Sequence, residues 1–266
     1  MSPWWSIILL AIFLIGLTKS GFGAGVGLMI VPMSAAAYAH LPGGAEAALP
    51  FLLPLLIAGD LIAVYHWRAA HDWKIITRLL PGSVVGIILG SLLLHWFASR
   101  ENKHLAESLI NLEIGLESIF LVSLNWYREW RAKHAPPAYQ PTMLKSTAVG
   151  IFAGVSSTLA HAAGPIIALH LLPQRLPRSV FVGTCALYFF IVNSAKIPGY
   201  YMAGLFTQVQ PLFSLQFLPL VLVGALAGLW LNKKINDILF SKIVYAITFL
   251  LGFYVLARGI TGLASA

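Results

Sequence analysis

The sequence has few charged residues and almost no cysteine. Only 10% of its 266 residues are charged and 59% are hydrophobic, whereas soluble domains carry about 25% charged residues. This balance excludes a soluble globular domain, because several apolar runs approach the roughly 20 residues that a membrane-spanning helix needs. The single cysteine, Cys185, excludes an intramolecular disulfide, and we expect it to be an ordinary buried helix residue.

Acidic residues are scarcer than basic ones, and this imbalance gives a formal net charge of +8. Such a charge could indicate nucleic-acid binding, but the distribution of the basic residues argues against a nucleic-acid partner. Twelve of the 17 Lys and Arg residues fall in four short stretches, namely 66–78, 126–145, 173–179 and 232–242. The positive-inside rule predicts that these stretches are cytoplasmic loops, and the eight tryptophans lie near segment ends, as interfacial residues do. We therefore expect the protein to lie in a lipid bilayer.

The apolar stretches divide the chain into two sets of five. The polar stretch 126–144, with three prolines, is the predicted cytoplasmic linker between a first transmembrane repeat, 1–125, and a second, 145–266. We read the first stretch as a membrane segment, because it lacks the basic start of a cleavable signal peptide. In each set, two apolar pieces separated by small residues precede three full-length helices. The segments are 4–17, 23–40, 47–66, 75–97, 105–125, 145–160, 164–173, 178–198, 212–231 and 239–258.

The two halves also share a glycine pattern. Leu80-Pro81-x4-Gly86-x3-Gly90 in the first half matches Leu218-Pro219-x4-Gly224-x3-Gly228 in the second. Small residues at this spacing let a neighbouring helix approach closely. The pattern does not reveal the oligomeric state, because such a helix contact can form within one chain or between chains.

The charge map predicts opposite orientations for the two halves. The basic stretch 66–78 follows the third segment and is cytoplasmic, so the loop 41–46 lies outside. Its counterpart in the second half, 173–179, carries two arginines and lies inside. The halves are therefore predicted to be inverted repeats, with both termini on the outer side of the membrane.

This orientation requires each opening pair of segments, 4–40 and 145–173, to cross the membrane an even number of times. Segments 4–17 and 164–173 are shorter than the hydrocarbon core of about 30 Å, so a re-entrant hairpin fits better than two full spans. The predicted fold is an all-α polytopic membrane protein with two inverted repeats. Each repeat is a broken re-entrant helical hairpin followed by three transmembrane helices.

Broken helices that meet near the midplane in inverted repeats are typical of secondary transporters, and the breaks indicate the binding site. The first break, residues 18–27, contains four glycines and Lys19. A helix that restarts near Gly23 would direct free N–H groups at a cavity, which favours an anion. The candidates are Lys19, Gly23 and Gly25. Alternatively, the glycines only allow close packing, and Lys19 extends to the interface.

The second break, residues 156–165, gathers hydroxyl groups and an imidazole. Ser157, Thr158 and His161 are the candidate substrate contacts there. His161 could donate a hydrogen bond to an anion or carry a proton, because an imidazole titrates near neutral pH; alternatively it is a packing residue. Pro165 fits the first turn of a restarting helix, where its missing N–H costs nothing.

Four further polar residues interrupt apolar segments. Asp60 is a candidate for binding a coupling proton or cation, because an intramembrane acid is costly to place, and Asn193 occupies the matching position in the second half. Both could instead hydrogen-bond to hairpin backbone. Lys196 is a further substrate-binding candidate, unless it extends to the interface. Glu113 and Glu117 lie one helical turn apart and could line a polar interior, an oligomer contact or a coupling site.

The residues at both breaks resemble the motifs of a known family. Gly16-Leu-Thr-Lys-Ser-Gly-Phe-Gly-Ala-Gly-Val-Gly, followed by Pro32, is similar to the first motif of the TauE/SafE sulfite-exporter family. His161-Ala-Ala-Gly-Pro, with Phe181-Val-Gly-Thr and Asn193-x-x-Lys196-x-Pro198, is similar to the second-half pattern of one of its branches. The resemblance extends over essentially the whole chain.

This resemblance implies movement of sulfite, sulfonates or other organosulfur anions across the bacterial inner membrane. Two positions depart from the family pattern. His161 stands where this branch often has Asn, and Ala24 stands where Gly is common. Because His161 is a predicted ligand-facing residue, the identity of the substrate is the property that the resemblance implies least firmly.

The combined prediction is a secondary transporter, and more specifically an exporter, of sulfite, a sulfonate or a related small organosulfur anion. It would work by alternating access around a midplane site, with Asp60 and His161 as candidates for a coupling ion. An anion channel and a transporter of a non-sulfur oxyanion or carboxylate are the alternatives. We expect no enzyme, since no Gly-x-Ser-x-Gly, His-Glu-x-x-His or paired-aspartate motif is present, and no metal or cofactor.

Overall fold

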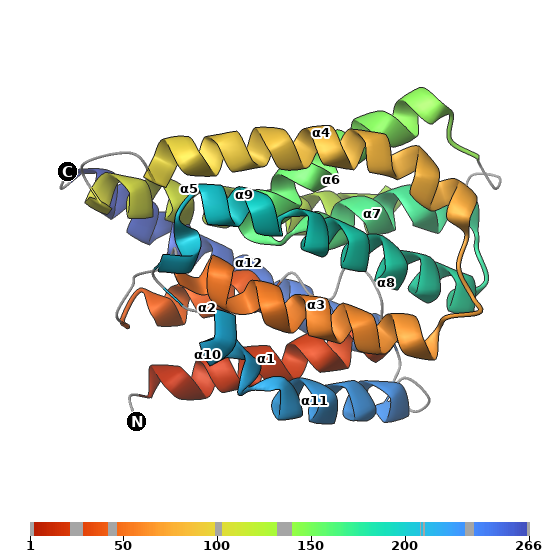
Figure 1. The fold of residues 1–266 in the computed structure, drawn as a ribbon, viewed down its shortest axis with the longest axis horizontal. Coiled ribbons are helices and arrows are strands. Elements are labelled where there is room, and N and C mark those ends of the chain that lie inside the picture. The colour runs from red at the N-terminus through yellow and green to blue at the C-terminus, as the bar shows by residue number, and fades with distance from the viewer. Residues whose placement is uncertain are drawn as a thin grey trace.

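The computed structural model describes residues 3–21, 29–41, 47–98, 103–131, 140–207, 209, 211–231 and 237–264, and every regular element in these ranges is a helix (Figure 1). The first half contains α1 (Trp4–Gly21), α2 (Ile30–Tyr38), α3 (Ala48–His66), α4 (Trp73–Ala98) and α5 (Lys103–Arg131). The second half contains α6 (Met143–Ala160), α7 (Ala163–Leu171), η3 (Leu172–Gln174), α8 (Arg178–Ala195), α9 (Ile197–Met202), η4 (Leu205–Thr207), α10 (Pro211–Leu215), α11 (Leu218–Leu231) and α12 (Asp237–Ala264).

Each predicted apolar segment corresponds to a helix or a pair of helices, so the all-α polytopic fold class is confirmed. Five stretches in the described residues are long and apolar enough to cross a membrane, and they lie in α3, α4, α6, α8 with α9, and α12. Helix α5 continues to Arg131 and takes in the start of the predicted linker. The division into two repeats and a linker stays a prediction.

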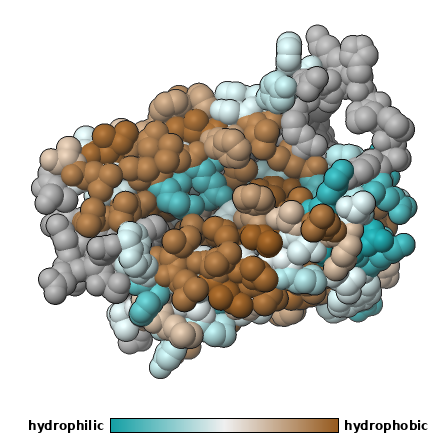
Figure 2. Space-filling model, turned by 90° about the horizontal axis from the view of Figure 1, so that it is seen from above, coloured by the Kyte–Doolittle hydropathy of each residue, from teal (hydrophilic) through white to brown (hydrophobic). Residues whose placement is uncertain are grey.

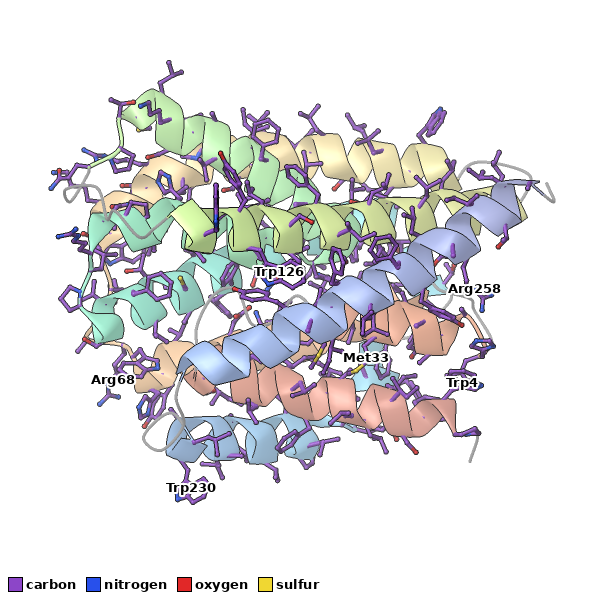
Figure 3. The ribbon with its side chains drawn as sticks, turned by 180° about the vertical axis from the view of Figure 1, so that it is seen from behind. Trp4, Met33, Arg68, Trp126, Trp230 and Arg258 are labelled. Atoms are coloured by element: carbon purple, nitrogen blue, oxygen red, sulfur yellow. The ribbon has the colours of Figure 1, made fainter. Side chains whose placement is uncertain are left out.

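The chain termini and the turns that follow α3 and α7 lie at two opposite ends of the bundle (Figure 1). Figure 3 places Arg68 and Trp230 at one end and Trp4 and Arg258 at the opposite end. The Arg78 guanidinium donates to the Pro141 carbonyl at 3.3 Å, which joins two of the basic stretches directly.

The space-filling view shows the same division of the surface. Its face is largely apolar, with polar residues gathered at one end and a smaller polar patch inside the apolar area (Figure 2). An apolar belt bounded by polar ends is the surface that a bilayer requires. The end with the basic stretches is the one predicted to be cytoplasmic.

Each opening pair of helices begins and ends at the same end of the bundle. The Trp4 and His40 rings stack with centroids 3.9 Å apart, so the start of α1 lies beside the end of α2. In the second half, the Ser146 hydroxyl and the His170 ring are 3.3 Å apart, so α6 begins where α7 ends. These contacts agree with an even number of crossings for each pair. The inverted relation of the two halves stays a prediction.

Helix α1 is longer than the predicted segment 4–17. Its 18 residues extend about 27 Å and include the Thr18–Gly21 part of the predicted break. The Trp67 indole, at the end of α3, lies 3.5 Å from the Ser20 carbonyl, so α1 runs along the full length of α3. The Thr18 hydroxyl bonds back to the Leu14 carbonyl at 2.8 Å, which lets a polar residue stay inside the helix.

The matched glycines bring the two halves into backbone contact. Helix α4 packs on α6, and α11 packs on α1. A methyl group added at Gly86 would overlap the Ile151 carbonyl of α6, and one added at Gly224 would overlap the Phe13 carbonyl of α1. Each Gly-containing helix thus packs on the opening helix of the other half.

We expect Gly86→Ala and Gly224→Ala each to lower the free energy of unfolding by about 1–3 kcal/mol, because the added methyl meets backbone that has no room to move. Thermal unfolding in detergent measures this effect. Val84→Ala is the control, since Val84 is on α4 but half-exposed on its surface. Wild-type melting temperatures for both glycine variants would contradict the close approach.

Candidate functional site

A cavity of about 60 Å³ lies inside the bundle, between the two halves of the chain. Its wall comes from α1, α2 and α3 of the first half, and from α7, α8 and the end of α6 of the second. A single water needs about 10–15 Å³ of such a volume. The cavity therefore accommodates a few waters or one small ion, and it excludes a bulky organic substrate unless the helices move.

Lys19, Asp60 and Asn193 form a hydrogen-bonded chain on one wall of this cavity. The Lys19 ammonium contacts the Asp60 carboxylate at 2.5 Å, and the Asn193 amide donates to the other carboxylate oxygen at 2.6 Å. Asp60 is 1% exposed and the Lys19 side chain 15%. Both acidic oxygens are therefore bound, and α1, α3 and α8 are joined across the two halves.

Lys196 lies behind the part of the cavity wall that Ser157 and His161 form. Its ammonium is fully buried and donates to the Ser157 carbonyl at 2.8 Å, the Ser157 hydroxyl at 3.1 Å and His161 Nδ1 at 2.8 Å. These three acceptors use all the donors of an ammonium group. Lys196 does not line the cavity itself, but two of its partners, Ser157 and His161, do.

The backbone of His161 is unusual because it has positive φ. With φ of 52°, His161 is in the left-handed region and ends α6, and its N–H bonds to the Ser157 carbonyl at 3.1 Å. A non-glycine residue in this region costs roughly 1–2 kcal/mol. His161 Nε2 lies 3.0 Å from the Leu49 carbonyl. Because Nδ1 accepts from Lys196 and Nε2 faces a carbonyl, the hydrogen-bond pattern fits a neutral ring protonated at Nε2.

The charges at the site do not balance. With Lys19 and Lys196 protonated and Asp60 ionised, the three groups sum to +1. Among the described residues, Asp60 is the only carboxylate that forms a salt bridge with either lysine. Isolated charge at this depth is costly. One monovalent anion in the cavity would neutralise the site.

The first turn of α7 adds neutral donors to the cavity wall. Ala163, Gly164 and Pro165 border the cavity, and Pro165 lies in the first turn of the helix, as the sequence predicts. The N–H groups of a first helical turn have no intrahelical partner, and the helix dipole is positive there. This turn therefore faces the cavity with donors that suit an anion.

The structure brings together five of the predicted site residues, since Lys19, Asp60, Ser157, His161 and Asn193 line one cavity. Thr158 and Lys196 do not line this cavity. The Thr158 hydroxyl bonds to the Gly154 carbonyl within α6 at 2.8 Å. Lys196 lies behind the cavity wall. Gly23 and Gly25 lie outside the described residues.

Three contributors had no signal in the sequence. Cys185 and Phe189 of α8 line the cavity, and the Lys19 ammonium lies 5.3 Å from the centre of the Phe189 ring. Tyr200 is fully buried and donates to the Thr158 carbonyl at 2.6 Å. An apolar transmembrane helix gives no indication of which of its faces borders a cavity, so only the positions of neighbouring helices reveal these residues.

Comparison with known proteins gives one match. The family model described as sulfite exporter TauE/SafE matches residues 8–255, which is nearly the whole chain. The chain therefore belongs to the TauE/SafE family. Neither the curated proteins nor the solved structures contain a significant match.

Proposed function

We propose that this TauE/SafE family member is a secondary transporter that moves sulfite, or a related small organosulfur monoanion, across the bacterial inner membrane. The observation that carries the proposal is the cluster of Lys19, Lys196 and Asp60 at a cavity of about 60 Å³, which sums to +1 when all three groups are ionised. The charge selects an anion, and the volume selects a small one. The family name supplies sulfite as the first candidate.

The anion contacts come from both halves of the chain. Lys19 of the first half and the first turn of α7 in the second half both line the cavity. The Lys196 charge acts from behind Ser157 and His161, so it attracts an anion without touching it. A site shared between two halves can open to either side when one half moves relative to the other, which is the geometry of alternating access.

Asp60 pairs with the Lys19 ammonium, which lowers the cost of placing that charge inside the bundle. The Asp60 carboxylate accepts a hydrogen bond from the Lys19 ammonium in this conformation. An entering anion competes with the carboxylate for this ammonium. Asp60 keeps its bond to Asn193 on α8, so the exchange alters the link between α1 and the second half. The direction of net transport follows the combined gradients of the anion and of any ion that moves with it.

Uptake of labelled sulfite into proteoliposomes tests the transport activity, with methanesulfonate, sulfate, thiosulfate, taurine and sulfoacetate as competitors. We expect saturable exchange, strongest competition from small monoanions and no unitary currents in planar bilayers. Large unitary currents would instead identify an anion channel.

The site itself is tested through Cys185, the only cysteine of the chain, which lines the cavity and is 1% exposed. We expect methanesulfonate to slow alkylation of Cys185 by a small neutral reagent at least threefold, because the bound anion blocks access to the thiol. Methanesulfonate is used because sulfite itself reacts with thiol reagents. Saturable transport without any protection of Cys185 by transported anions would place the binding site elsewhere.

A further inference from the structure

A second cavity, of about 740 Å³, lies between α5, α6 and α7 and opens at the surface of the bundle. Its wall is mostly apolar, and Phe120 and Phe152 are 62% and 70% exposed. Three polar side chains interrupt this wall on α5 and α6, namely Glu113, Glu117 and Ser156. None of them has a role in the anion site described above.

The two carboxyl groups are buried without a cation. Glu113 and Glu117 interact directly with each other, and the Oε2 atom of each is buried and has no hydrogen-bond partner among the described residues. Within the same part of the chain, neither forms a salt bridge. Two carboxylates side by side in an apolar wall would place two uncompensated charges at membrane depth, which is prohibitively costly. The pair therefore holds a proton in this conformation.

The neighbouring helices offer no competing charge. His170 of α7 lines the same cavity but contacts Ser146 instead. The other described titratable groups on elements packed against α5, or near Glu113, are Tyr38 on α2, Lys74, Arg78 and His95 on α4, Lys145 on α6, Tyr200 on α9, and Tyr245, Tyr254 and Arg258 on α12. Within the described residues, none of the cations among them forms a salt bridge with Glu113 or Glu117. Tyr254 and Arg258 both contact His40, and the Tyr200 hydroxyl donates to the Thr158 carbonyl.

Adjacent residues of α6 connect this pair to the anion site. Ser156 is 6% exposed and lines the second cavity, and its hydroxyl interacts with the Glu117 carboxyl group. The next residue, Ser157, lines the anion cavity and accepts from Lys196. A shift of the end of α6 therefore moves both sites together. Asp60 and His161 are already bound by the two lysines, so the Glu pair is the part of this region that can exchange a proton freely.

We propose that Glu113 and Glu117 together bind one proton that is transported along with the anion. This proposal rests on the transport function proposed above. A proton on the pair removes a negative charge near the anion site, so the anion binds more tightly to the protonated protein. By linkage, the bound anion favours protonation by the same factor. Two ligands that promote each other's binding cross together, which makes the transport of a monoanion with one proton electroneutral.

The test compares two measurements on the same proteoliposomes. Exchange of labelled sulfite at equal pH needs no net proton movement, whereas accumulation of sulfite under an inward proton gradient does. The variants are Glu113→Gln, Glu117→Gln and the double variant, with the membrane potential clamped. Asp72→Asn is the control, because Asp72 caps the start of α4 through the Lys74 N–H and Asn caps equally well. The Gln variants also control for the change of sulfite protonation with pH.

We expect wild type and Asp72→Asn to accumulate sulfite up to about tenfold per pH unit, as one proton per anion dictates. The Gln variants should keep exchange within about twofold of wild type and lose the accumulation. Accumulation in the double variant equal to that of wild type would overturn the proposal. Folded Gln variants that lose both exchange and accumulation would also overturn it. Wild-type exchange that does not respond to the gradient would overturn the coupling and leave the proposed transport intact. Absence of sulfite exchange in the wild type would instead overturn the proposed function.

Discussion

Replacing Lys19 with Gln is expected to raise the anion concentration needed for half-maximal transport at least 100-fold. The substitution removes the one ammonium that lines the cavity and leaves the Asp60 carboxylate facing the same space. A charge about 4 Å from an anion contributes roughly 4 kcal/mol at an effective dielectric constant of 20. The loss of this charge lowers the affinity for the anion, and repulsion by the unpaired Asp60 carboxylate lowers it further. Uptake of labelled sulfite over a concentration series measures the change.

The same substitution is expected to destabilise the protein, because Asp60 is 1% exposed and loses its ion-pair partner. Removing one member of a buried pair costs about 3–5 kcal/mol. The double variant Lys19→Gln/Asp60→Asn removes both charges and should recover most of the thermal stability. It keeps the Lys196 charge, so the site again sums to +1.

The double variant separates charge balance from direct contact. If the Lys19 ammonium binds the anion directly, transport in the double variant stays at least tenfold below wild type although the fold is restored. Recovery of wild-type transport would show that the net charge of the site is sufficient, and that Lys19 serves only to neutralise Asp60.

The membrane fold was predictable because each element has a local signal. Apolar runs bounded by basic stretches indicate spanning helices and their cytoplasmic ends. The end of α1 was not predictable in this way. Thr18 and Lys19 are polar residues next to glycine, which favours a break, but Thr18 bonds to its own helix and Lys19 to Asp60 on α3. Tertiary contacts therefore keep these residues helical.

The site was predictable as a set of residues but not as an arrangement. Charged and polar side chains inside apolar segments are conspicuous, so Lys19, Asp60 and Lys196 were all identified from the sequence. Their partners depend on distances between helices that the sequence does not contain. The left-handed backbone of His161, which brings its Nδ1 to within 2.8 Å of Lys196, also has no sequence signal.

Lys196→Met is expected to abolish measurable transport although Lys196 lies behind the cavity wall. Without the ammonium, the site loses its excess positive charge and sums to zero. The Ser157 hydroxyl and His161 Nδ1 would then lose the donor that they share, and they line the anion cavity as unsatisfied acceptors. A charge about 6 Å from the anion contributes roughly 3 kcal/mol at an effective dielectric constant of 20, which is about 100-fold in affinity.

His161→Asn is the matched variant, because it removes the imidazole and retains the Lys196 charge. Asn tolerates the left-handed backbone of this position, so the turn between α6 and α7 is expected to keep its shape. We expect His161→Asn to weaken sulfite transport by no more than about tenfold, far less than Lys196→Met does. The ranking is the result that matters: if His161→Asn were as damaging as Lys196→Met in folded protein, the imidazole would be the essential group. If the Lys196 ammonium attracts the anion from a distance, Lys196→Met is the more damaging variant. The attraction then depends on the Lys196 charge and not on which side chain occupies position 161.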